Sequence, residues 1–136
     1  MPKILIIDDD ADFRDTCRMI LESVDFGVLE AGSPEEGFEK VRAEKPDLVI
    51  LDILMPREYE GFEVARRIRE ELHMTALPIL MLSAIHDVKQ VPYRFEPDRT
   101  YLPLDAVLDK AAGPEALLMK AREMLGLYRE RPEEPL

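Results

Sequence analysis

Three apolar runs without any alternation of apolar and polar positions constrain the fold of this chain more than any other feature. They are ILII at 4–7, LVIL at 48–51 and PILML at 78–82. A strand with one face in water alternates, whereas a short continuous apolar run indicates a strand that is buried on both faces. Such strands are typical of parallel sheets that are covered by helices on both sides.

Segments with a helical pattern separate these runs. Apolar residues at three- and four-residue spacing predict helices over 13–24, 33–46, 61–72 and 113–128. Ser33, Pro34 and Glu36 form a capping-box pattern at the start of the second helix. Two shorter pieces, at 28–29 and 105–110, predict the remaining strands. This alternation predicts an α/β fold, a three-layer α/β/α sandwich around a doubly wound sheet of five parallel strands.

Polar residues follow the predicted strands where each strand ends. Asp8 and Asp9 end the first strand, Asp52 the third, Ser83 the fourth and Lys110 the fifth. Because parallel strands end at one edge of a sheet, and ligands bind in the crevice outside that edge, we expect these five residues to lie close together.

The three carboxylates would repel one another without a nearby positive charge. Mg²⁺ prefers oxygen ligands of this kind, and the Lys110 ammonium could contact a phosphate oxygen. The Ser83 hydroxyl could donate a hydrogen bond to another phosphate oxygen. This set of residues favours phosphoryl transfer, with the central Asp52 as the nucleophile that forms an aspartyl-phosphate.

Composition excludes several other classes of protein. The 136-residue chain has a formal net charge of -11, which argues against binding to nucleic acid or to an anionic membrane. Its one cysteine, Cys17, excludes an internal disulfide and lies at a core position of the first predicted helix. With no segment of transmembrane length and no signal-peptide pattern, the expected location is cytoplasmic. We expect one domain over 1–127 and a charged tail over 128–136.

Several motifs, in this order, resemble those of response regulator receiver domains, the CheY-like family of two-component signalling. They are ILIIDDD, PDLVILDILMP with GFEVARRIR, PILMLSA and VLDK, and the resemblance covers residues 2–127. It implies the flavodoxin-like strand order 2-1-3-4-5. It also implies a histidine kinase or phosphotransfer protein as partner, and a downstream protein target that the sequence does not identify. A homodimer is left open.

The resemblance also implies a role for each site residue. Asp52 would accept the phosphoryl group, Asp9 and Asp52 would bind Mg²⁺ directly, and Asp8 would act mostly through water. The implied set is completed by the backbone carbonyl of Leu54 on the metal, and by Ser83, Lys110 and the backbone N–H of Ala84 on the phosphoryl group. Asp10 matches no such role and suits a helix N-cap.

The chain also departs from the family pattern. Ala111 follows Lys110 where receivers usually have proline, and the segment between Ser83 and Lys110, with three prolines, predicts a shortened helix or a long loop over 86–105. Leu54 and Ile85 match the two receiver positions near the phosphoryl group that often tune its lifetime, and neither apolar side chain can orient a water molecule. We therefore expect slow self-dephosphorylation. The resemblance to receivers also implies a switch and no conventional enzyme.

Two other functions compete with this interpretation. The atypical segment and the missing proline are compatible with a receiver-derived protein-binding module that works without phosphorylation. A Mg²⁺-dependent phosphatase with an aspartate nucleophile is disfavoured, because such enzymes of the haloacid-dehalogenase type need a second aspartate where this chain has Leu54.

Overall fold

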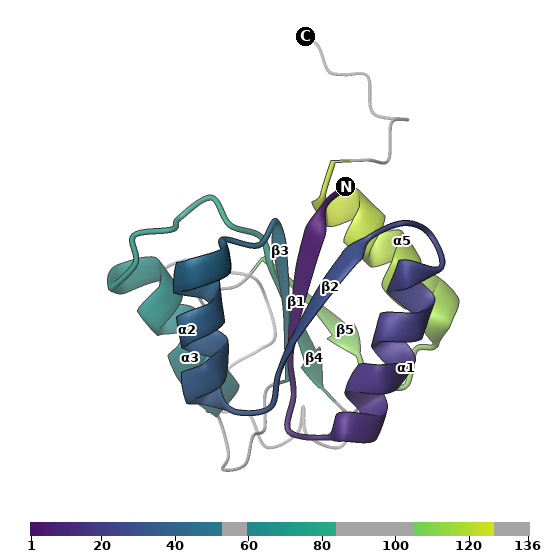
Figure 1. Ribbon diagram of the computed structural model, residues 1–136, viewed down its shortest axis with the longest axis horizontal. Helices are drawn as coiled ribbons and strands as arrows, with labels where there is room; N and C mark the ends of the chain where they lie inside the picture. Colours follow the sequence, from purple (N-terminus) through teal and green to yellow (C-terminus); the bar gives the residue numbers. More distant parts are fainter. Residues whose placement is uncertain (53–59, 84–104, 127–136) are drawn as a thin grey trace, which may run out of the picture.

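The computed structural model describes residues 1–52, 60–83 and 105–126, which form a parallel five-stranded sheet with helices on both faces (Figure 1). The strand order is β2-β1-β3-β4-β5, which confirms the predicted doubly wound topology. The elements are β1 (Lys3–Ile7), α1 (Ala11–Glu22), β2 (Gly27–Ala31), α2 (Pro34–Glu44), β3 (Leu48–Asp52), α3 (Glu60–Glu70), β4 (Ile79–Ser83), β5 (Ala106–Asp109) and α5 (Pro114–Met124).

The two faces of the sheet bury alternate residues of each strand. Ile4 and Ile6 of β1 pack in one cluster with α1 and α5, whereas Leu5 and Ile7 pack in a second cluster with α2 and α3. Figure 1 shows these two helical layers on either side of the sheet. All side chains of β3 and β4 are buried, as expected for strands at the centre of such a sandwich.

Local side-chain bonds begin the first two helices. The Asp10 carboxylate accepts hydrogen bonds from the backbone N–H groups of the first turn of α1, which confirms its predicted capping role. Ser33 Oγ accepts from the N–H of Glu36 at 3.1 Å, and the Glu36 carboxylate accepts from the N–H of Gly32 at 2.9 Å. At Gly37 in α2, a Cβ would lie 2.6 Å from Ile7 Cδ1, so glycine permits the close approach of this helix to β1.

A buried charge joins α3 to the start of β5. Arg69 is 9% exposed and pairs with Asp105 at 2.8 Å, and it also donates to the backbone carbonyls of Met74 and Leu77. The Asp105 carboxylate accepts a further bond from the N–H of Ile79. These bonds hold the beginnings of β4 and β5 together, at the edge of the sheet opposite to the predicted site.

Several predictions lie outside the described residues. They concern Leu54, Ala84 and Ile85, the segment 86–105 apart from its last residue, Asp105, and the tail 128–136. None of the helices in the described residues combines the length and the hydropathy that a membrane span requires.

Candidate functional site

The strand register brings the predicted polar residues to one edge of the sheet. Ile7 of β1 pairs with Leu51 of β3, so Asp8 follows β1 at the level where Asp52 ends β3. On the other side of β3, Asp52 pairs with Leu82, one residue before Ser83. The backbone N–H of Lys110 donates to the carbonyl of Ser83 at 2.7 Å, which fixes the residue after β5 beside the end of β4.

Three carboxylates form a cluster at this edge. Asp8, Asp9 and Asp52 each offer an oxygen, and these oxygens lie within 4.8 Å of one another. Asp8 is 1% exposed and Asp52 6%, whereas Asp9 is exposed. Two buried carboxylates and one exposed carboxylate make a site that can take a cation from solvent.

Lys110 supplies the positive charge that faces this cluster. Its Nζ lies 2.9 Å from Asp8 Oδ2 and 3.5 Å from Asp52 Oδ2. Partial burial disfavours the charged ammonium, but the bonds and charges of Asp8 and then Asp52 outweigh it and raise the pKa of Lys110 above its ordinary value. The peptide bond between Lys110 and Ala111 is trans, and Lys110 reaches both carboxylates without a following proline.

The Ser83 hydroxyl is buried beside these charges. The residue is 1% exposed, and its Oγ has no hydrogen-bond partner among the residues described. A buried hydroxyl without a partner costs free energy, so such a group commonly marks a place where a ligand or water completes the bonding. The clustered carboxylate oxygens are suitable ligands for Mg²⁺. The Ser83 hydroxyl and the Lys110 ammonium are suitable hydrogen-bond donors for an anionic group.

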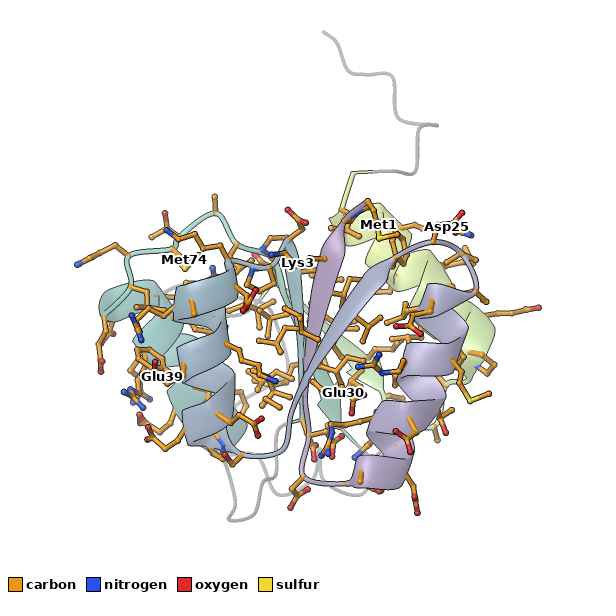
Figure 2. The ribbon with its side chains drawn as sticks, in the orientation of Figure 1. Met1, Lys3, Asp25, Glu30, Glu39 and Met74 are labelled. Atoms are coloured by element: carbon orange, nitrogen blue, oxygen red, sulfur yellow. The ribbon has the colours of Figure 1, made fainter. Side chains whose placement is uncertain are left out.

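A second set of charges holds the end of β1 in place, and the sequence patterns did not predict it. Arg14 of α1 donates to the backbone carbonyl of Asp8 at 2.7 Å and to the Glu30 carboxylate at 2.9 Å, and Arg18 donates to the same carboxylate. Figure 2 labels Glu30 on β2, on the side of the sheet that faces α1. Burial would raise the pKa of Glu30, but the bonds from Arg18 and Arg14 lower it. In the sequence, the signal that could have indicated these ion pairs was the acidic Glu30 in the otherwise apolar segment VLEA.

Cys17 behaves as a core residue. It is 1% exposed, and burial, followed by the negative charge of Asp8, raises the pKa of its thiol to about 12. Because the thiolate is the reactive form, we expect a thiol reagent at neutral pH to label the folded chain at least about a hundredfold more slowly than the unfolded chain.

The raised pKa also makes the stability of the folded protein depend on pH. The stability that the neutral Cys17 thiol contributes to the folded state is fully present below the pKa of the thiol in the unfolded chain, and it is lost as the pH rises toward about 12.

In the labelling experiment, a Cys17→Ser variant controls for reaction of the reagent at other groups. Labelling of the folded chain at the rate of a free thiol would contradict the buried position.

The model of the response regulator receiver domain family matches residues 4–120. Among curated proteins, the DNA-binding dual master transcriptional regulator RpaA of Synechocystis is 31% identical over 125 residues, which cover 92% of this chain and 49% of that protein. The first curated relatives are about twice as long as this chain, and the matched residues cover 32–49% of their lengths.

Two solved structures are similar over almost their entire length. A putative response regulator from Chloroflexus aurantiacus is 28% identical with a TM-score of 0.78, covering 92% of this chain and 98% of that one. The response regulator TrrA of Thermotoga maritima, in complex with Mg²⁺ and BeF, is 27% identical with a TM-score of 0.75, covering 91% and 99%. These similarities agree with the fold and the strand order of the sheet.

Proposed function

Because this chain belongs to the response regulator receiver domain family, we propose that it is a phosphorylation-dependent switch in which Asp52 accepts a phosphoryl group. Receiver domains are signalling proteins of two-component systems and not conventional enzymes. One observation carries the proposal for this chain: the buried Asp52 clusters with two other carboxylates and lies 3.5 Å from the Lys110 ammonium. The Ser83 hydroxyl at the same edge has no hydrogen-bond partner among the described residues.

Each residue has a distinct part in the proposed transfer. A carboxylate oxygen of Asp52 attacks the phosphorus of a phosphohistidine, and a P–O bond forms as the P–N bond breaks and its electron pair returns to the imidazole. Lys110 Nζ, now 3.5 Å from Asp52 Oδ2, neutralises charge on the transferred group. Ser83 Oγ donates a hydrogen bond to a phosphoryl oxygen. The backbone N–H of Ala84, outside the described residues, is proposed as a further donor.

The carboxylate cluster is proposed to hold Mg²⁺. Asp9, Asp52 and the backbone carbonyl of Leu54 would bind the ion directly, and Asp8 would act mostly through water. The ion would offset the negative charge of the carboxylates and of the phosphoryl group. The complex of TrrA with Mg²⁺ and BeF supports a site for this ion in a similar fold.

We propose the partners by class of protein. The donor would be a histidine kinase or phosphotransfer protein, and the signal would pass to a downstream protein through contacts of residues 1–127. The expectation that nucleic acid is not a partner stays a prediction, because RpaA is described as DNA-binding and this chain covers about half of it. A cytoplasmic location and a charged tail over 128–136 are likewise proposed.

One experiment separates the proposed switch from its rivals. The protein is incubated with Mg²⁺ and acetyl phosphate, and its intact mass and acid–base lability are measured. An adduct that is stable in acid and labile in base, at one phosphoryl group per chain, is the expected result. No adduct on the folded protein would favour the binding module, and rapid turnover of many phosphomonoesters would favour a phosphatase.

The lifetime of the adduct gives a further prediction. Leu54 and Ile85 cannot orient an attacking water molecule, so Leu54→Asn or Ile85→Thr should speed loss of the phosphoryl group roughly threefold or more. The measurement follows the adduct by mass after removal of the donor, with Leu54→Val as an apolar control. Equal decay in all variants would show that these side chains do not control water.

A further inference from the structure

The Lys110 ammonium has a third neighbour besides the two carboxylates. Its Nζ lies 4.5 Å from the ring centroid of Phe13 in the first turn of α1. An aromatic ring attracts a cation over its face at distances up to about 6 Å. Asp8, Asp52 and the Phe13 ring together therefore define where the ammonium lies.

The position of the Phe13 ring is set by other contacts. The backbone N–H of Phe13 donates a hydrogen bond to the Asp10 carboxylate at 3.3 Å, and this bond stabilises the first turn of α1. The partly buried side chain packs against the cluster between the sheet, α1 and α5. The ring is thus a fixed support, whereas the lysine side chain is long and mobile.

On the Phe13 side, Lys110 borders a cavity of about 240 Å³ between α1 and α5. The hydroxyl of Thr16, which lines it, donates to the carbonyl of Asp12, and the carboxylate of Asp109 accepts from the N–H of Ala111. Within the described residues that line this cavity, the Phe13 ring is the group that contacts the ammonium.

The ring differs from the carboxylates in what phosphorylation does to it. Asp8 and Asp52 would share their charge with Mg²⁺, and one oxygen of Asp52 would be bonded to phosphorus and no longer anionic, so both side chains would hold Lys110 less strongly. The ring is neutral, binds no Mg²⁺ and keeps its attraction for a cation. Ala111 also lacks the restriction that a proline after Lys110 would impose.

We propose that Phe13 is a positioning residue that keeps the Lys110 ammonium beside Asp52 when Mg²⁺ and the phosphoryl group engage the carboxylates, a role that rests on the proposed function. The cation–π contact with the ring replaces part of the attraction between the carboxylates and the ammonium. It therefore limits the conformational freedom that the Lys110 side chain would gain during phosphoryl transfer.

The contact itself is tested by NMR without any phosphorylation. With ¹³C-labelled lysine, the ε-methylene protons of Lys110 should be shifted upfield by the ring in the wild-type protein and in Phe13→Tyr, but not in Phe13→Leu. The shift should persist when Mg²⁺ and beryllium fluoride are added. Its disappearance on that addition would overturn the proposal, because the ammonium would then have left the ring.

The role in transfer is tested by the rate of phosphorylation with acetyl phosphate. Phe13→Leu should lower the rate roughly three- to tenfold, and Phe13→Tyr should restore it. Ile20→Val, which trims another side chain of the same cavity, is the matched control and should leave the rate unchanged. Circular dichroism establishes that each variant is folded.

Coupling to Lys110 separates positioning from packing. In a Lys110→Met background, Phe13→Leu should cause no further loss of rate, because both changes remove the same contact. An equal loss in both backgrounds would overturn the proposal and assign Phe13 to helix packing. If the wild-type protein acquires no phosphoryl group, the proposed function fails, while the NMR shift still decides whether the ring holds Lys110.

Discussion

The Lys110→Met variant is expected to unfold at a lower temperature than the wild-type protein when no divalent cation is present, and to bind Mg²⁺ more tightly. The change removes the cation that lies 2.9 Å from the buried Asp8 and 3.5 Å from Asp52, and so increases the repulsion between these two neighbouring carboxylates. Since Lys110 is partly exposed, we expect a loss of about 1–2 kcal/mol in the free energy of unfolding, or about 3–8 °C in Tm.

Mg²⁺ should reverse this loss. The ammonium and the metal compete for the same carboxylates, so the affinity for Mg²⁺ should rise roughly tenfold in the variant, while the rate of phosphorylation should fall roughly a hundredfold. Thermal unfolding across a Mg²⁺ titration measures both stability effects. Lys120→Met is the matched control, because Lys120 pairs with Glu123 on the surface of α5. A Lys110→Met protein as stable as this control, with unchanged Mg²⁺ affinity, would contradict the assigned ion pairs.

The Asp52→Asn variant is expected to acquire no phosphoryl group from acetyl phosphate. Asparagine has nearly the same shape but lacks the anionic oxygen that attacks phosphorus, so labelling should fall by at least about a hundredfold. The buried cluster also loses one of its negative charges, and we expect weaker Mg²⁺ binding.

Intact-mass measurements at a series of donor concentrations follow this change. Asp15→Asn, an exposed aspartate on α1, controls for the removal of a negative charge in general. Labelling of Asp52→Asn at the wild-type rate would move the acceptor to another residue. The variant should also show normal thermal unfolding, so that a change in labelling cannot be attributed to misfolding.

The sheet and its polar edge were predictable because a simple pattern determines both. Continuous apolar runs identified the central strands, and parallel connections place every strand end at one edge, so Asp8, Asp52 and Ser83 could be brought together without coordinates. The capping role of Asp10 was predictable for a similar reason, since it depends only on neighbours along the chain.

Interactions between side chains from distant elements were not predictable in this way. Arg69 lies in an amphipathic helix where an arginine is usually solvated, and only the folded chain places it against Asp105, 36 residues later. The contact of Phe13 with Lys110 also depends on how α1 approaches the end of β5. A pattern of residue types contains the period of a helix, but not the direction in which a long side chain turns.

Chemical mapping of the phosphoryl group tests the central claim most directly. The wild-type protein is treated with acetyl phosphate and Mg²⁺, then reduced with sodium borohydride, which converts an aspartyl-phosphate into homoserine, and its peptides are sequenced by mass spectrometry. We predict homoserine at position 52 alone, and only when both Mg²⁺ and the phosphodonor are present. Homoserine at position 8 or 9, or a phosphoryl adduct that yields none at position 52, would contradict the account.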